Sequence, residues 1–381
     1  MSDLGFALRA AREAAGVSLA GMATRTHYSK PLLGLLETGK RKINPEHVEA
    51  YSRALNVPLD ILYDPPDDPL RAAHEWLVSD SPTVVQSRSG RRVGSSLASE
   101  LEKRVIELRH LDDLMSSDDL FPVVREELSE AQEVIQSASY TEKTGRRLLT
   151  VAAELAQLAG WVASDAGRYR EAQRIYLDGV AAARDATNST LGAQLLSSLS
   201  YQMANVGNPR DAALLARSAE KGAVDASPVV RALLLERVAW SSAKIHDHTG
   251  TRRALDTVDD AYEGRSPGII EPEWVYWLDR REIDVMAGRC LIELGNPSGA
   301  EPLLANAISS YAADHIREVA LYLSWLAEAY ARAGIMDAAQ ETLIQAQAKA
   351  RKIRSVRLDL RISQVTSLVS GGGTQRQDCS R

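Results

Sequence analysis

The residues with the clearest chemical meaning are the cations around a short predicted helix. Lys30 starts this helix, and a Lys-Arg-Lys run at 40–42 follows the glycine that would end it. Cationic side chains at such places neutralise phosphates, and a helix between them can enter the major groove of DNA. The segment 18–42 therefore indicates DNA binding.

Residue patterns for other chemistry are weak. His246 and His248 could suggest a metal site, but residues two apart do not share a helix face, so a structural or exposed pair is the better interpretation. The sequence has no phosphate-cradling glycine loop, no Gly-x-Ser-x-Gly elbow and no His-Glu-x-x-His motif. Its two cysteines, Cys290 and Cys379, lie far apart and imply no disulfide framework. We therefore predict no enzyme, no cofactor and no metal.

Two short helices joined by a tight turn are predicted to position the cations. Ser18 and Ser29 are suitable N-caps, because their hydroxyls can accept a backbone N–H of the first turn. Gly39 suits the C-terminal break. Leu33 and Leu36 are three residues apart and should pack inward. The other side of the second helix, which should face outward, carries Lys30, Pro31, Gly34 and Leu35.

Glu37 is the polar residue at the packed end of this second helix. A carboxylate in that place needs a cation, since an unpaired buried charge is costly. Arg12, in the preceding predicted helix 8–16, is the candidate partner. We predict that the two form a structural pair.

Residues 4–63 resemble the XRE family of lambda-repressor-like helix-turn-helix domains, which have five helices. The matching pieces are residues 8–18, 29–41, 45–58 and 59–62. The resemblance implies that the Arg12–Glu37 pair ties the first helix to the recognition helix. The DNA contacts that it implies are Ser18, Thr26, His27, Tyr28, Ser29, Lys30, Pro31, Gly34, Leu35, Lys40, Arg41 and Lys42.

The recognition helix departs from the family pattern at three positions. Family members usually have polar or basic side chains where Pro31, Gly34 and Leu35 stand. A leucine can contact a thymine methyl group but cannot form a bidentate hydrogen bond with guanine. Either specificity depends on the turn residues and on DNA shape, or the domain binds DNA weakly. A helical hairpin that has lost DNA binding and serves in assembly is the alternative.

The charge is unevenly distributed along the 381 residues. The net charge is −6, and residues 1–63 contribute +2 while the remainder contributes −8. An acidic body behind a mildly basic head suits a protein that contacts DNA at one end. No signal peptide and no long apolar run is evident, so we expect a cytoplasmic protein without membrane contact. The excess of Arg over Lys indicates a high-GC genome of actinobacterial type.

The domain boundaries follow from composition. Residues 1–64 form the DNA-binding domain, because the Asp- and Pro-rich segment 64–69 interrupts any helix. A short helix and a linker are expected over 65–96. Helical repeats are expected over 97–369, and the glycine-rich segment 370–381 should be a disordered tail.

A repeat with a spacing of 39 to 46 residues organises the second domain. Each unit has an apolar helix, a turn with glycine, and a second helix that begins near a small alanine. The anchor alanines are Ala172, Ala212, Ala254, Ala300 and Ala339. The glycine should make the turn, and the alanine should let the second helix pack closely against the first.

The first unit resembles a tetratricopeptide repeat through Gly160, Gly167, Tyr169, Ala172 and Tyr176. The predicted fold class is all-α: a five-helix head followed by a right-handed TPR-like helical solenoid. An XRE head on such a body resembles the RRNPP-type regulators. That resemblance implies a homodimeric cytosolic sensor, with a short signalling peptide or another ligand in the concave groove and an operator in double-stranded DNA as partner.

The groove residues are nominated by helix phase, since the first helix of each hairpin should line the concave face. The candidates are Gln157, Trp161, Asp165, Gln194, Tyr201, Asn205, Glu236, Trp240, His246, Arg281, Asp284, Arg289, Glu328 and Arg332. Asn205 could bind a peptide backbone, and Trp161, Tyr201 and Trp240 could form apolar walls. These aromatics could equally pack between repeats, and a small molecule is as compatible as a peptide.

Two hypotheses from different classes remain open. The first is a transcriptional regulator that reads an operator and whose TPR-like domain senses a ligand and mediates dimerisation. The second is a TPR module that binds or sequesters a partner protein, with a weak or vestigial helix-turn-helix. Site-specific DNA binding distinguishes them.

Overall fold

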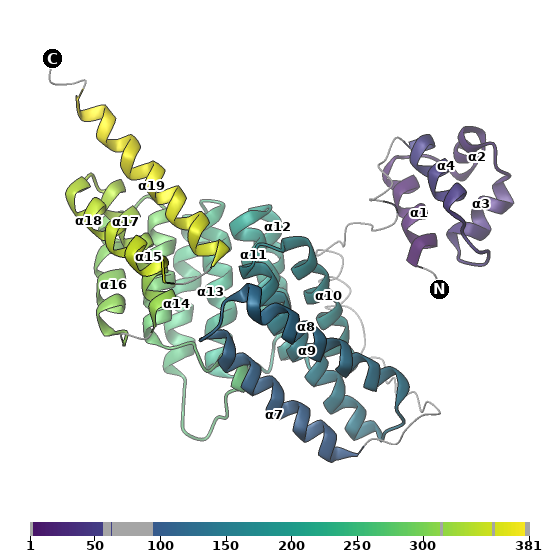
Figure 1. The fold of residues 1–381 in the computed structure, drawn as a ribbon, viewed down its shortest axis with the longest axis horizontal. Coiled ribbons are helices and arrows are strands. Elements are labelled where there is room, and N and C mark those ends of the chain that lie inside the picture. The colour runs from purple at the N-terminus through teal and green to yellow at the C-terminus, as the bar shows by residue number, and fades with distance from the viewer. Residues whose placement is uncertain (1–2, 56–61, 63–93, 313–314, 353–354, 378–381) are drawn as a thin grey trace. The chain divides into compact units, whose positions relative to one another are not determined.

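The structure, a computed structural model, describes residues 3–55, 62, 94–312, 315–352 and 355–377 (Figure 1). The chain divides into two compact units, residues 1–68 and 69–381. The regular elements of the described residues are helices, and no β-strand occurs among them. This confirms the predicted all-α class. The predicted short helix and most of the predicted linker, residues 65–96, lie outside the described residues.

The first unit has four described helices: α1 (Asp3–Ala14), α2 (Leu19–Thr26), α3 (Lys30–Glu37) and α4 (Pro45–Leu55). Both α3 and α4 pack against α1 and α2. The apolar faces enclose one core that includes Leu8, Met22, Leu33, Leu36 and Val48. Of the fifth predicted helix the structure describes Leu62, which is buried in this core.

The ends of α2 and α3 follow the predicted capping. The Ser18 hydroxyl accepts a hydrogen bond from the Gly21 N–H at 3.0 Å, and the Ser29 hydroxyl accepts one from the Leu32 N–H at 3.3 Å. After α3, Gly39 adopts a positive φ of 68°. The N–H groups of Gly39 and Lys40 then donate to carbonyls of the last turn, which completes a Schellman motif.

The second unit has thirteen described α-helices and one short 3-10 helix, η1 (Glu273–Val275). The α-helices are α7 (Ser95–Asp112), α8 (Ser117–Ser137), α9 (Glu142–Asp165), α10 (Tyr169–Asp185), α11 (Ser189–Val206), α12 (Pro209–Gly222), α13 (Pro228–Lys244), α14 (His248–Glu263), α15 (Arg280–Glu293), α16 (Pro297–Ser310), α17 (Ile316–Arg332), α18 (Met336–Ala350) and α19 (Val356–Gln377). Helices α7 and α8 pack against α9.

The helices from α9 to α18 form five successive hairpins, from α9–α10 to α17–α18 (Figure 1). The first helices of the hairpins also contact one another in sequence, so α9, α11, α13, α15 and α17 form an inner row. The five anchor alanines are all buried; four lie at the first turn of their second helices, and Ala254 lies one turn further into α14. The predicted repeat is therefore confirmed, and the described second unit is a TPR-like helical solenoid.

The turns inside three hairpins use glycine as predicted. Gly167, Gly295 and Gly334 have φ angles of 79°, 78° and 79°. This left-handed conformation costs a glycine nothing, because it has no Cβ.

The second and third hairpins turn differently. In the second hairpin Gly207 lies in the turn as predicted, but its φ is −124°. In the third hairpin the glycine prediction is wrong, because the positive φ, 57°, belongs to His246 and Gly250 already lies inside α14. Asn208 and Asp247 cap the helices that follow these turns through their side chains.

Elements that flank the inner row connect its two ends. Arg317, at the start of α17, donates to the Met115 carbonyl between α7 and α8. At the C-terminal end of α9, Asp165 lies 2.7 Å from the Arg357 Nε of α19. The first and last hairpins are therefore linked through the α7–α8 turn and through α19.

Helix α19 packs against α17 and α18 and extends beyond them (yellow in Figure 1). It ends at Gln377, whereas the sequence predicts a disordered tail from residue 370. Glycine weakens a helix without interrupting it as proline does, so a helix can continue through the three glycines 371–373.

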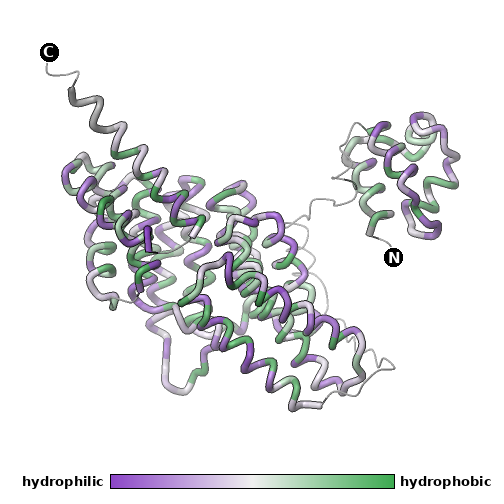
Figure 2. Tube along the Cα trace, in the orientation of Figure 1, coloured by the Kyte–Doolittle hydropathy of each residue, from purple (hydrophilic) through white to green (hydrophobic). Residues whose placement is uncertain are grey.

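Hydrophobic and hydrophilic residues are interspersed along the helices (Figure 2). Helices such as α10 and α14 bury one apolar face, whereas α11 and α13 of the inner row are buried over most of their residues. Among the described residues no helix is both long and apolar enough to cross a membrane.

Candidate functional site

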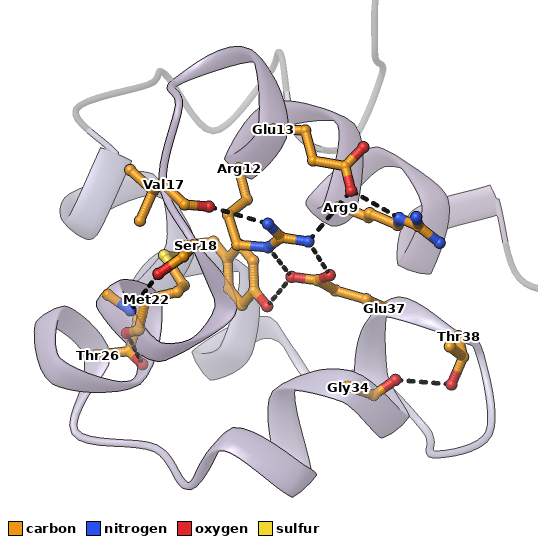
Figure 3. Close-up of polar contacts among 12 residues, drawn as sticks. Arg9, Arg12, Glu13, Val17, Ser18, Met22, Thr26, Gly34, Glu37 and Thr38 are labelled. Atoms are coloured by element: carbon orange, nitrogen blue, oxygen red, sulfur yellow. Dashed lines mark hydrogen bonds and ion pairs between the residues drawn. The ribbon is translucent and has the colours of Figure 1, made fainter.

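A buried polar network fixes the recognition helix to its neighbours (Figure 3). Arg12 of α1 donates from Nε and Nη2 to the two carboxylate oxygens of Glu37, at 2.7 and 2.8 Å. The Tyr51 hydroxyl of α4 donates to the same carboxylate at 2.8 Å. Arg12 also donates to the Val17 carbonyl. The contact between Arg12 and Glu37 is the one expected from the sequence.

Tyr51 is the member of this network that the sequence analysis missed. The phenol is fully buried, and burial together with the Glu37 carboxylate raises its pKa far above the ordinary value. It therefore remains a neutral donor. Its spacing from Val48 and Leu55 on the apolar face of α4 marked it as buried, but nothing local indicated its partner.

The outward side of α3 lies as helix phase predicts. Leu33 and Leu36 are fully buried, while Lys30 and Pro31 are exposed and Leu35 is 39% exposed. Ser18, His27, Ser29, Lys40, Arg41 and Lys42 are also exposed. This surface can present cations and two apolar side chains to a nucleic acid.

Thr26, Tyr28 and Gly34 are also expected DNA contacts, but they are half-buried and contact other residues of the first unit. The Thr26 hydroxyl donates to the Met22 carbonyl at 2.8 Å. The Tyr28 ring packs edge-on against His47, with ring centroids 5.4 Å apart. A Cβ at Gly34 would lie 3.6 Å from the Leu19 side chain of α2, so this face of α3 packs close to α2. Their contribution to DNA binding stays a prediction.

Two adjoining cavities lie in the second unit, along the inner row of helices. Their volumes are about 200 and about 180 Å³. They share a wall that is made by Trp161, Ser198, Tyr201, Arg289, Leu321 and Arg357. We call the cavity bordered by Trp240 and Arg361 the first cavity, and the one bordered by Glu236 and Arg237 the second cavity.

Nine of the predicted groove residues line these cavities: Gln157, Trp161, Asp165, Gln194, Tyr201, Asn205, Glu236, Trp240 and Arg289. They come from α9, α11, α13 and α15. In the first four hairpins, the first helix therefore contributes predicted residues to the cavity walls. Asn205, the amide expected to bind a peptide backbone, donates to the Tyr201 carbonyl of its own helix at 2.7 Å.

Five predicted groove residues do not line either cavity. His246 is exposed in the turn after α13, and Arg281 and Asp284 pair with Asp279 and Arg280 near the start of α15. Arg332 is exposed at the end of α17, where it pairs with the buried Glu328. His246, Arg281 and Arg332 lie at or beside helix ends, and the part of all five residues in ligand binding stays a prediction.

The sequence analysis missed four residues that shape the cavities: Arg237, Trp325, Arg357 and Arg361. Arg237 and Trp325 lie on inner-row helices, and their phase could have nominated them. Arg357 and Arg361 belong to α19, which follows the last hairpin. Nothing local indicates that this helix returns to the cavity.

The carboxylates around the cavities are strongly affected by burial. Burial raises the pKa of Glu236 to about 8, although Arg237 and Arg289 oppose the shift. Burial likewise raises the pKa of Asp112 to about 6, against the influence of Arg317. Near neutral pH Glu236 is therefore mostly protonated, and the guanidinium groups beside it lack a full counter-charge.

Guanidinium groups and aromatic rings alternate along the cavity walls. Arg289 lies 4.3 Å from the Trp240 ring centroid and 4.8 Å from that of Trp325. Arg237 lies 4.5 Å from the Tyr201 centroid. Although burial favours the neutral phenol, the surrounding guanidinium groups lower the pKa of Tyr201. Such walls suit a flat ligand with negative charge.

Comparison with known families gives one match. Residues 3–61 match the family described as a helix-turn-helix domain. Together with the geometry of α2 and α3, this match defines the first unit as a helix-turn-helix domain, the class that places a helix in the major groove of DNA. Comparison with curated proteins finds no match.

Two solved structures resemble the whole chain at low similarity. One is Bacillus thuringiensis PlcR in complex with the peptide PapR7 and DNA, with 11% identity, a TM-score of 0.36, and coverage of 81% of this chain and 93% of that one. The other is the apo form of the competence regulator ComR from Streptococcus vestibularis, with 11% identity, a TM-score of 0.37, and coverage of 91% and 97%. With TM-scores this low, neither likeness indicates a function for this chain.

Across the described ranges, no three His, Cys, Asp or Glu side chains lie together as metal ligands would. Cys290 is buried, and burial raises the pKa of its thiol.

Proposed function

We propose that this protein is a transcriptional regulator of the XRE type that binds an operator through α3. The observation that carries the proposal is the buried network of Arg12, Glu37 and Tyr51. It fixes α3 against α1 and α4 while the outer side of α3 and the basic run 40–42 stay exposed. A rigid helix beside phosphate-binding cations is what readout of the major groove requires.

The second unit is proposed to sense a ligand and to hold two copies of the chain together. The cavities support the sensing role, because they are lined by polar and aromatic side chains from all five hairpins, from the end of α7 and from α19. A ligand there contacts elements that are far apart in the sequence. Its binding energy can therefore alter how the hairpins are arranged.

The test is affinity selection of sheared genomic DNA on the purified protein, followed by sequencing of the retained fragments. We expect a two-fold symmetric motif with half-sites about one helical turn, or roughly 10 bp, apart. Lys30→Glu should lose this enrichment, because it places a carboxylate against the phosphates. Lys221→Glu, the same charge change on an exposed position of α12, is the matched control and should retain it.

A protein-binding module with a vestigial helix-turn-helix is the second candidate. The apolar side chains of Pro31 and Leu35 on the outer side of α3 favour it, since they cannot read a base by hydrogen bonding. Under this candidate no motif is enriched, and Lys30→Glu and the wild type retain the same DNA. Partners of the second unit would then be sought by crosslinking.

A further inference from the structure

Buried hydrogen-bond donors face the cavities without acceptors. Arg237 and Arg289 are 7% and 5% exposed, and the Nε of each has no hydrogen-bond partner among the described residues. The same holds for the indole N–H of Trp240. Leaving buried donors unpaired costs free energy, and an unpaired charge costs more. These donors therefore indicate an acceptor that arrives from outside the chain.

The nearby carboxylates do not serve as that acceptor. Asp165 is held by Ser117 and Arg357, and Glu282 by the hydroxyls of Tyr311 and Tyr322. Glu328 is held by Arg361 and Arg332.

Glu236 is the remaining carboxylate beside the two arginines. Its nearest carboxylate oxygen lies 3.9 Å from Arg237 Nη1, beyond hydrogen-bonding distance. Burial raises the pKa of Glu236 to about 8, so it carries little charge near neutral pH. Burial also lowers the pKa of Arg237, as expected for a cation without a full counter-ion.

The shape of the site restricts the ligand further. Trp161 and Tyr201 are stacked, with ring centroids 6.1 Å apart, and both border the two cavities. Flat apolar groups pack well on such surfaces. The two cavities share six lining residues, so one small ligand can contact both.

We propose that the two cavities bind a small carboxylic acid with a flat apolar body, whose carboxylate is held by Arg237 and Arg289. The planar guanidinium fork matches the two oxygens of a carboxylate. The body of the ligand packs against Trp161 and Tyr201. This inference rests on the proposed function in taking the cavities as the sensing site, and it names the class of ligand.

The test is isothermal titration calorimetry of the full chain with 2-naphthoate, benzoate, 2-naphthamide and inorganic phosphate. Naphthoate should bind more tightly than the neutral amide by about 10- to 100-fold, the value of a hydrogen bond to a charged group. Arg237→Gln should weaken naphthoate binding by a similar factor, and Arg237→Lys by less. Arg280→Gln, an exposed position on α15 that pairs with Asp259 and Asp284, is the control and should leave binding unchanged.

Several outcomes overturn the inference. Equal binding of naphthoate and naphthamide, preferred binding of phosphate, no binding of any probe at millimolar concentration, or unchanged affinity in a folded Arg237→Gln protein each contradicts it. A thermal melt of every variant establishes folding, and Arg237→Lys preserves the charge should Arg237→Gln unfold. Selection of genomic DNA on the same samples separates the two proposals. Failed carboxylate binding with an intact DNA motif counts against the ligand class alone, and carboxylate binding without a motif counts against the regulator alone.

Discussion

The stability of the first unit depends on one buried carboxylate. Glu37 accepts hydrogen bonds from Arg12 and Tyr51, and the three side chains join α1, α3 and α4. Removing the carboxylate leaves the Arg12 charge buried without its partner. Such a loss usually costs more than the pair contributes, because the charge is no longer solvated.

Glu37→Ala should therefore destabilise the first unit by roughly 3–5 kcal/mol. Differential scanning calorimetry of the full chain should show the transition of this unit at a lower temperature and that of the solenoid unchanged. Glu49→Ala is the control, since it removes a carboxylate from an exposed position on α4. That change should cost less than about 1 kcal/mol. Equal effects of the two substitutions would show that the pair is not structural.

Gly160 offers a second residue-level test, within the first hairpin. A Cβ at this position would lie 2.6 Å from the Tyr176 ring, which is fully buried. Gly160→Ala should therefore cost about 1–3 kcal/mol by overpacking. Gly371→Ala in α19 meets no atom within 4 Å and should be neutral or stabilising by up to about 1 kcal/mol. Urea unfolding of both variants measures the difference, and a tolerated Gly160→Ala would contradict the close packing.

Glu236 should make the solenoid sensitive to pH. Its folded pKa is about 8, above the ordinary value of 4.5, so the folded state binds a proton that the unfolded state releases. Its contribution to stability is therefore present below about pH 4.5 and is lost as the pH rises through 8. The charged groups that face it are Arg237 on its own helix and Glu282 and Arg289 on α15.

Glu236→Gln stays neutral at every pH and should become more stable than the wild type as the pH rises from about 5 to about 9. The difference at the upper end should reach a few kcal/mol, since each pKa unit corresponds to about 1.4 kcal/mol. Thermal melts across this range measure it. A constant difference between variant and wild type would indicate that Glu236 ionises normally.

At the scale of elements, the sequence predicted the features that depend on residues close together in the chain. The caps Ser18 and Ser29, the inward residues of α3 and the anchor alanines each depend on a few neighbouring residues, and the structure has them as expected. The inner row was also predictable, because its helices repeat one phase. This was enough to nominate nine residues that line the cavities.

What could not be predicted depends on contacts between distant elements. Arg317 reaches the turn before α8, and Arg357 reaches Asp165 at the end of α9. Small rotations between successive hairpins decide whether such ends meet, and no single helix encodes them. For the same reason, the sequence did not show that α19 contributes arginines to the cavity wall, or that Arg281 and Arg332 lie outside it.

The basic run after α3 should carry a measurable share of the electrostatics of DNA binding. Lys40, Arg41 and Lys42 are all exposed. Replacing the three with Ala should reduce the slope of log Kobs against log salt by about 2–3, because each phosphate contact contributes roughly 0.9. Fluorescence anisotropy over a salt series measures the slope. Lys221→Ala is the control, and an unchanged slope in the triple variant would show that the run does not contact phosphate.

At the scale of the whole molecule, the two units are proposed to have different tasks, DNA binding and ligand sensing. The first presents a helix fixed by a buried ion pair, and the second contains the two polar cavities. If occupancy of the cavity alters affinity for DNA, then DNA must alter affinity for the ligand by the same factor. Ligand binding measured with and without operator DNA gives this coupling directly.

The central claim is that α3 reads a specific DNA sequence. Its most direct test is the ratio of the affinities for the selected site and for a scrambled duplex of equal length, at one salt concentration. We predict a ratio of about 10³ or more for the wild type. For Lys30→Glu the ratio should fall close to one. A wild-type ratio near one, or the same ratio in both proteins, would contradict the claim.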